Sequence, residues 1–320
     1  SFILLNECTF VKYYYIINFI VFYLYKKVYK MTIRHLRIFI TVADLGSMTA
    51  AAKALYISQP TVSQAITELE THYGIKLFER LSKRLFITQN GSRLLSYARH
   101  ITSLVNEMEQ VIKNPEEIGS MTIGSSLTIG ECLLPALIST FSKKHPNFQV
   151  NAIIKNTLDI ENLIALNIVD FAVVEGMVHS TDIITEPFEN DELALVCGKE
   201  HPLYNVKTVS PDELANINFI VREKGSGTRE LFENAMSANE IQWRPSWECS
   251  GSDIIKSAAV NGIGVAVISR RLVQHELKKD LLHAFQIEGL ELKRKFSIAY
   301  HKNKYLTESM LAFISLCKNI

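Results

Sequence analysis

The most constraining feature of the sequence is a set of three short helix patterns in close succession. Apolar side chains recur every three or four residues between positions 36 and 43, and Gly46 then ends the first helix. Four alanines between positions 50 and 55 predict a short second helix that packs closely. Ser58 is a strong N-cap candidate for the third helix, and Pro60 falls in its first turn, where a missing N–H costs nothing.

The third helix is predicted to expose short, polar, uncharged side chains. Val62, Ile66 and Leu69 have the spacing of its buried face. The candidate DNA-binding residues here are Ser58, Gln59, Pro60, Thr61, Ser63 and Gln64. Side chains of this kind hydrogen bond to base edges and phosphates when a helix N-terminus enters the major groove. The pattern by itself also fits a protein-docking module.

A short β-hairpin that carries cations is predicted directly after the third helix. It covers residues 77–87 and brings the candidate DNA contacts Arg80, Lys83 and Arg84. Such a wing contacts the phosphate backbone of DNA, whatever the base sequence. The whole chain has a net charge of only +1, but residues 31–90 hold seven Lys or Arg against four Asp or Glu. This basic region is compatible with a local DNA contact.

A longer helix pattern with heptad spacing follows between residues 92 and 113. Its apolar positions are separated by four and three residues in alternation, which is the a/d pattern of a coiled coil. The candidate dimerisation residues are Leu94, Ala98, Ile101, Val105, Met108 and Ile112. Such a seam pairs two chains, whereas the alternative is an amphipathic helix packed on its own domain. Pro115 ends the pattern, because proline disfavours helical geometry in the residue before it.

From Met121 onward, short apolar runs alternate with helical patterns in two successive series. The first series runs to about residue 174, and the second runs from Leu193 to Ile268. Strand–helix alternation predicts α/β architecture with mostly parallel sheets, and two series predict two lobes. Ligands of open α/β sheets bind beyond the carboxyl ends of the strands.

Two hydroxyl-rich loops follow predicted strands of this region. Gly124–Thr128 follows the first strand, and Gly225–Arg229 follows a strand of the second series. Each offers hydroxyls and backbone N–H groups at a helix N-terminus, which is a ready anion site. Thr157 adds a hydroxyl after another strand. The alternative is that these hydroxyls only cap their helices.

The motifs of common enzyme classes are missing from the sequence. Gly262-Ile263-Gly264 has part of a dinucleotide fingerprint, but Val267 replaces the third glycine and the motif precedes a strand. There is no GxxxxGKS/T phosphate loop, no GxSxG nucleophile elbow and no HExxH pair. The five cysteines are scattered, without a CxxC pair or Cys/His cluster. We therefore expect a protein that is not an enzyme and that holds no metal or other cofactor.

Residues 57–70, with Gly74, Leu77–Arg80 and Thr88–Gly91, closely resemble the LysR-type transcriptional regulators. The resemblance starts at Met31 and continues to the C-terminus. Further pieces that resemble the family are residues 170–172, 201–203 and 261–266. Two departures are Gln64, where many relatives carry Arg, and Asn167, where they usually carry Gly. The first departure puts the strength of the operator contact at that position in doubt.

The resemblance implies three domains and a two-lobed sensor. An all-α winged helix-turn-helix DNA-binding domain is expected at residues 31–90, and a coiled-coil linker helix for dimerisation at 91–115. An α/β effector-binding domain, similar to periplasmic binding proteins of type 2, is expected at 120–320. Lobe I is expected at about residues 120–192 and 295–320, and lobe II at about 193–294.

The resemblance also implies where an effector binds. The expected contacts are Ser125, Ser126, Thr128, Ile129, Thr157, Ser226, Gly227 and Thr228. The Gly225–Arg229 loop resembles that of regulators of sulfur assimilation and of carbon-fixation genes. We expect a small anion in the cleft between the lobes, either a carboxylate or an oxyanion such as sulfate.

Residues 1–30 differ in amino-acid composition from the rest of the chain. They lack an initiating Met, and their apolar stretch at 13–25 is shorter than the ~20 residues needed to span a bilayer. There is no small-residue cleavage site of a secretory signal. We interpret the segment as translated upstream sequence that precedes a start at Met31. A membrane anchor is the alternative.

Together these features predict a sequence-specific transcriptional regulator whose activity a small anion modulates. The expected partners are a double-stranded DNA operator and further copies of the chain, in a homodimer or homotetramer. RNA polymerase stays open as another partner, no membrane partner is expected, and the expected compartment is the cytoplasm. Two alternatives remain, a membrane-anchored solute-binding receptor and a DNA-binding regulator without a small-molecule effector. A receptor has no use for the third helix or the heptad seam.

Overall fold

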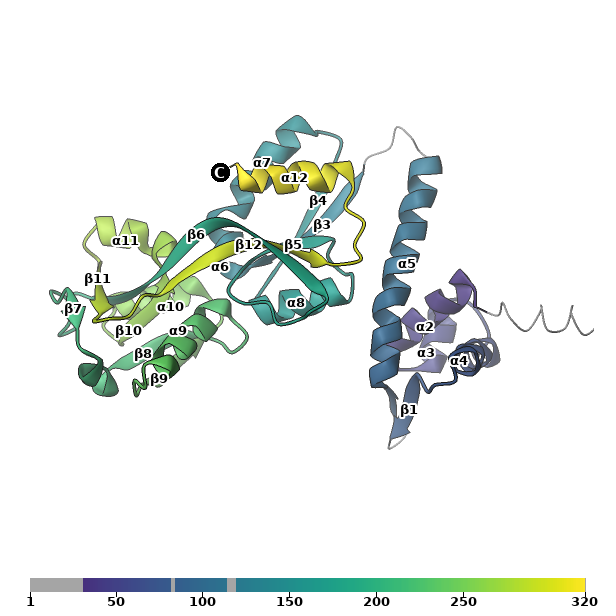
Figure 1. Cartoon of the computed structure of the whole chain (residues 1–320), viewed down its shortest axis with the longest axis horizontal. Helices are drawn as coiled ribbons and strands as arrows, with labels where there is room; N and C mark the ends of the chain where they lie inside the picture. Colours follow the sequence, from purple (N-terminus) through teal and green to yellow (C-terminus); the bar gives the residue numbers. More distant parts are fainter. Residues whose placement is uncertain (1–30, 82–83, 114–118, 320) are drawn as a thin grey trace, which may run out of the picture. The chain divides into compact units, whose positions relative to one another are not determined.

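The computed structural model shows two compact units, with the division after Glu109 (Figure 1). The described residues are 31–81, 84–113 and 119–319. The predictions for residues 1–30 and for Lys83 therefore lie outside the described residues. In the part of the chain that the structure describes, no helix is both long enough and apolar enough to cross a membrane.

The N-terminal unit consists of three short helices, a β-hairpin and a long helix. Its elements are α2 (Ile33–Leu45), α3 (Met48–Ala54), α4 (Gln59–Tyr73), β1 (Phe78–Leu81), β2 (Arg84–Ile87) and α5 (Gln89–Lys113). The order is the one that the sequence predicts. The second helix starts slightly earlier than expected, because the hydroxyl of Ser47 caps it by accepting from the backbone N–H of Ala50 at 3.3 Å.

Local capping sets both ends of α4. The hydroxyl of Ser58 accepts from the backbone N–H of Thr61 at 3.3 Å, and Pro60 lies in the first turn. Gly74 ends the helix with a φ of 68°, in the left-handed region that glycine adopts without a steric cost. These contacts fix where α4 starts and ends.

Apolar side chains from all three helices form the core of this unit. The fully buried members on α2 and α4 are Leu36, Phe39, Val42, Val62, Ile66 and Leu69. Phe39 also contacts Phe78 of the hairpin, with ring centroids 5.4 Å apart. Each such side chain stabilises the fold by roughly 1.5–3 kcal/mol relative to leaving it exposed. The hairpin is thereby held against the helices.

The C-terminal unit alternates strands and helices. Its elements are β3 (Ser120–Ser126), α6 (Leu127–Cys132), α7 (Leu134–Lys144), β4 (Gln149–Lys155), α8 (Thr157–Ala165), β5 (Phe171–Glu175), β6 (Ile183–Gly198), β7 (Thr208–Val209), η1 (Pro211–Asn216), β8 (Asn218–Arg222), α9 (Gly227–Ala238), β9 (Arg244–Cys249), α10 (Ser252–Val260), β10 (Val265–Ser269), η2 (Arg270–Val273), α11 (Gln274–Lys278), β11 (Leu282–Ile287), β12 (Lys293–His301) and α12 (Glu308–Lys318).

Two lobes share this unit, and two strands cross between them. Lobe I contains β3, β4 and β5, in which β3 pairs in parallel with both neighbours. Lobe II contains β7–β11, in which β8 pairs in parallel with β9 and β10. The crossing strands β6 and β12 are antiparallel to each other, and Figure 1 shows them side by side from one lobe to the other. The sequence predicts only the last part of β6, which in fact starts at Ile183.

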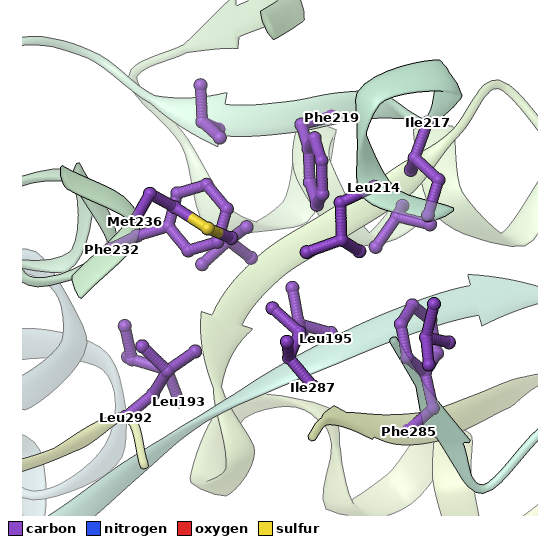
Figure 2. Packing of buried hydrophobic residues seen from close by; sticks show 14 of the residues in the cluster. Leu193, Leu195, Leu214, Ile217, Phe219, Phe232, Met236, Phe285, Ile287 and Leu292 are labelled. Atoms are coloured by element: carbon purple, nitrogen blue, oxygen red, sulfur yellow. The ribbon is translucent and has the colours of Figure 1, made fainter. Parts of the chain in front are cut away.

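Each lobe has its own apolar core. In lobe I, Phe171, Phe296 and Phe313 are fully buried together. In lobe II, Phe219 and Phe232 contact each other with ring centroids 5.2 Å apart. Figure 2 shows this second cluster, with Met236 beside Phe232. Because each lobe has its own apolar core, polar side chains lie at the junction between the lobes.

Candidate DNA-binding surface and effector site

The start of α4 carries the polar side chains expected to contact DNA. Gln59 and Pro60 are exposed, whereas Ser63 is half-buried. Gln64 is exposed and its amide donates to Glu68 Oε1 at 3.1 Å. Ser58 and Thr61 hydrogen bond to each other through their hydroxyls at 2.8 Å, so these two also serve the helix cap. All six predicted positions thus lie between the N-cap Ser58 and Gln64, at the start of α4.

The hairpin that follows α4 has the register of a small wing. Phe78 pairs with Ile87, and Arg80, which is exposed, pairs with Leu85. Arg84 begins β2, and its side chain is outside the described part of the structure. Arg80 is therefore the wing cation whose position the structure describes.

Glu70, which the sequence analysis missed, positions the wing. Its carboxylate accepts from the backbone N–H groups of Leu77 at 2.9 Å and Phe78 at 3.4 Å, and from Lys76 Nζ at 2.6 Å. Burial alone would raise the pKa of Glu70, but these hydrogen bonds and the charge of Lys76 hold it below its usual value. The sequence signal for this role is an acid in the last turn of α4, followed six residues later by the cation Lys76.

The apolar side chains exposed on α5 are only partly those of the predicted dimerisation seam. Ala98 is fully buried in its own unit, Leu94 and Val105 are half-buried, and the side chain of Ile112 is outside the described residues. The large apolar side chains exposed on α5 are Tyr97, Ile101, Leu104 and Met108, again with spacings of four and three. The difference arises because α5 also closes the core of the N-terminal unit, which takes up one side of the helix.

The predicted effector residues come together at the junction of the two lobes. Ser126 and Thr128 lie where β3 passes into α6, Thr157 begins α8, and Ser226 and Thr228 lie at the start of α9. All eight predicted residues, which also include Ser125, Ile129 and Gly227, are buried. The two loops that the sequence singled out and Thr157 thus form one cluster.

The carboxylate of Glu175, at the end of β5, occupies this cluster. One oxygen accepts from the hydroxyl of Ser126, and the other accepts from the backbone N–H of Thr128 at 3.4 Å. The backbone carbonyl of Glu175 also accepts from the hydroxyl of Thr157 at 2.9 Å. Glu175 is 1% exposed, and its carboxyl group lies among the groups that the sequence predicts for an anion. The sequence analysis did not single it out.

Two glycines allow the lobes to approach each other here. A Cβ at Gly227 would lie 2.3 Å from the carbonyl oxygen of Glu175, and one at Gly176 would lie 2.7 Å from the Cα of Gly227. The N–H of Gly227 donates to the hydroxyl of Thr157 at 3.3 Å, across the junction. Gly227, which is predicted as an effector contact, therefore allows close backbone approach between the lobes.

Arg294 of β12 connects the cluster to the crossing strands. Its guanidinium donates to the hydroxyl of Thr228 at 2.9 Å and to that of Thr128 at 3.2 Å. Its Nε donates to Asp191 Oδ2 at 2.7 Å, and Ser269 donates to the other oxygen of Asp191 at 2.7 Å. The sequence analysis missed Arg294. It stands two residues from each of the apolar Leu292 and Phe296, so all three side chains point to the same, inward face of the chain here.

Comparison with known families matches nearly the whole described chain. Residues 33–92 match the family "Bacterial regulatory helix-turn-helix protein, lysR family", and residues 115–319 match the family "LysR substrate binding domain". The comparison bears out the winged helix-turn-helix and the two-lobed fold class that the sequence motifs indicated.

Curated relatives match along almost their full length. The "Uncharacterized HTH-type transcriptional regulator YeiE" of Escherichia coli is 32% identical over 287 residues, which are 90% of this chain and 97% of that protein. The regulator CysL of Bacillus subtilis is 31% identical, with coverages of 89% and 96%. A "Probable RuBisCO transcriptional regulator" of Nostoc is 32% identical, with coverages of 88% and 86%. The predicted resemblance to these groups of regulators is confirmed.

Solved structures have the same architecture. Full-length OxyR of Pseudomonas aeruginosa superposes with a TM-score of 0.66 at 19% identity, and covers 91% of this chain and 94% of its own. The regulatory domain of Synechocystis CcmR, in complex with 2-PG, superposes with a TM-score of 0.59 at 25% identity, and covers 63% of this chain and 96% of its own. On all these grounds the chain belongs to the LysR family of transcriptional regulators, as a DNA-binding protein with an effector-binding domain and not as an enzyme.

Proposed function

We propose that the chain binds an operator as a homodimer, and that a small anion bound among Ser126, Thr128 and Thr228 modulates its activity. The observation that carries the effector part is Glu175. Its carboxylate already accepts hydrogen bonds from the predicted anion-binding groups, so their geometry suits a carboxylate oxygen. Since the chain acts on DNA, we propose the cytoplasm as its compartment.

An effector anion would compete with Glu175. Two carboxylates that share the same donors repel each other unless one takes up a proton. The effector would therefore displace the Glu175 side chain and take over the donors at Ser126 and Thr128. The hydroxyl of Thr157 donates to the backbone carbonyl of Glu175 and accepts from the backbone N–H of Gly227 in the other lobe, so this displacement would change how the lobes meet.

The regulatory domain of Synechocystis CcmR, which is similar to the C-terminal unit, was solved in complex with 2-PG. This similarity supports a small-molecule effector for the present chain. It favours the sensor proposal over a DNA-binding regulator without an effector.

The DNA part of the proposal assigns direct base contacts to Gln59, Ser63 and Gln64. Ser58, Pro60 and Thr61 set the helix start, and Arg80, Lys83 and Arg84 contact phosphates. Pairing of two chains along Tyr97, Ile101, Leu104 and Met108 would place two such helices on one DNA. An interrupted palindrome is the operator that such a pair fits.

A thermal-shift screen of the full chain against sulfate, phosphate and small carboxylates tests the effector proposal. At one hundred times the dissociation constant a ligand stabilises the native state by about 2.7 kcal/mol. The shift should vanish in Thr128→Val and in Thr228→Val. It should persist in the control Thr140→Val, whose hydroxyl bonds only to its own helix α7. A shift that survives both effector-site changes would refute the site, and no shift with any anion would favour a regulator without an anionic effector.

A further inference from the structure

A second polar pocket opens where the crossing strands meet η2. Its volume is about 530 Å³, and its charged lining residues are Asp191, Glu192, Arg270, Arg271, Lys293 and Arg294. Four cations thus face two acids. The pocket is large enough for a small ligand, since ligand sites commonly measure about 300–1,000 Å³.

The two acids of the pocket lie beside cations of the crossing strands. Asp191, whose side chain is fully buried, accepts from Arg294 and from Ser269 at 2.7 Å each. Glu192 lies opposite Lys293 in the register of β6 and β12, and Lys293 itself forms an ion pair with Glu291 at 3.0 Å. The negative charge of Asp191 is therefore balanced by Arg294 within the protein.

Arg270 and Arg271 are the two cations of the lining that lie outside the crossing strands. Arg270 is exposed, and among the described residues no acidic side chain forms an ion pair with it. Arg271 donates to the backbone carbonyl of Asn190 at 2.8 Å, and it pairs with Glu189 at 3.1 Å and with Asp191 at 3.7 Å, which holds its guanidinium at the pocket. Paired guanidinium groups bind phosphate and carboxylate oxygens bidentately.

We propose that this pocket binds a small anion with two or more negative charges. It is a site separate from the effector cluster, because none of Ser126, Thr157 and Ser226 lines it. The proposal does not depend on an effector at that cluster.

Arg294 is shared between the pocket and the effector cluster. It lines the pocket, while its guanidinium donates to the hydroxyls of Thr128 and Thr228. An anion that draws this guanidinium toward the pocket weakens both hydrogen bonds. Occupancy of the pocket would thus change the affinity of the cluster for its own ligand, and the effect would be reciprocal.

Isothermal titration of the full chain with pyrophosphate, at ionic strength held constant with sodium chloride, tests the proposal. Loss of one charged hydrogen bond should weaken binding about tenfold or more in Arg270→Gln and in Arg271→Gln. Arg270 is exposed, so its replacement leaves the fold intact. The matched control is Arg244→Gln, because Arg244 is an exposed arginine of lobe II outside the pocket.

The outcomes separate the two sites. Weakened binding in both pocket variants, with wild-type binding in Arg244→Gln and Thr157→Val, supports the proposal. Absence of binding to the wild-type chain, or unchanged binding in Arg270→Gln and Arg271→Gln, overturns it. Loss of binding in Thr157→Val with unchanged binding in Arg270→Gln places pyrophosphate in the effector cluster and also overturns it.

Discussion

Arg294 and Asp191 face each other across the two crossing strands, with Nε and Oδ2 2.7 Å apart and their side chains 3% and 0% exposed. This pair lies at the point where both lobes, the effector cluster and the second pocket meet. Its register is set by β6 and β12, so the strand pairing itself brings the two charges together.

Removing Asp191 should therefore destabilise the protein strongly. Asp191→Ala leaves the buried Arg294 without its counter-charge, and breaking such a pair costs about 3–5 kcal/mol. Glu291→Ala breaks the exposed pair with Lys293 and should cost at most about 1 kcal/mol. Denaturant unfolding of both variants measures the difference, and equal losses would contradict the role given to Asp191.

A methyl group at Gly227 should force the lobes apart. Its Cβ would meet the backbone oxygen of Glu175 at 2.3 Å, and overpacking of this kind costs about 1–3 kcal/mol. Gly251→Ala is the control, because the nearest atom to that Cβ belongs to Ile254 at 3.6 Å. Thermal unfolding of the two alanine variants should show a clear loss for Gly227→Ala alone.

Stability should depend on pH through His179, which connects the lobes. Its Nε2 lies 2.8 Å from Glu230 Oε1 on α9, and its Nδ1 lies 3.6 Å from Glu161 on α8. The hydrogen bond and charge of Glu230, and the charge of Glu161, raise the pKa of His179 above its ordinary value of 6.5. The stabilisation is thus complete below pH 6.5 and is lost as the pH rises through the raised pKa.

Melting temperatures of the wild type, His179→Gln and Glu230→Gln across this pH range check the prediction. Both variants should lose the same part of the pH dependence. The effect should be small, because the His179 side chain is 56% exposed. A pH profile that is identical in the wild type and both variants would exclude this role.

Specific DNA binding should depend on Gln59, and general DNA binding on Arg80. Loss of a base contact in Gln59→Ala should cost about 1–3 kcal/mol on the operator and much less on random DNA. Arg80→Gln should weaken binding to both and reduce the slope of log K against log salt by about 0.9. Fluorescence anisotropy over a salt series measures both effects. Lys143→Gln, on α7 of the other unit, is the control, and equal losses on both DNAs for Gln59→Ala would contradict its role.

Dimer formation should depend on the exposed stripe of α5. Leu104→Asp puts a charge into the middle of that stripe, where Leu104 is 52% exposed. Leu311→Asp changes a leucine of similar exposure, 49%, on α12. Sedimentation equilibrium should show dissociation to monomers only for Leu104→Asp. A dimer that survives this change would move the interface to another surface.

The sequence predicts the N-terminal unit well because its signals are local. A cap at Ser58, a proline at position 60 and a glycine at position 46 each act within one turn of helix, and the structure places them as predicted. Asn167 is another local case. It stands where relatives usually have glycine and adopts a φ of 50°, in a region that asparagine tolerates better than most residues.

The effector site is harder to predict because its partners are distant in the sequence. Thr128 and Arg294 hydrogen bond across 166 positions, and Ser126 and Glu175 across 49. A hydroxyl after a strand indicates a polar site, but only the fold shows that Glu175 fills it. The length of strand β6 was also underestimated. Its first half contains exposed polar residues and lacks a continuous apolar run, so it gives no strong strand signal.

The pairing of β6 with β12 also has a consequence for synthesis on the ribosome. Residues 199–292 separate the two strands, so lobe II is an insertion within the sheet of lobe I. Lobe II can fold as soon as its own strands emerge, whereas lobe I must wait for the last strand, β12, to leave the exit tunnel. The nascent chain therefore completes its second lobe before its first, and a prematurely terminated chain exposes the edges of β5 and β6.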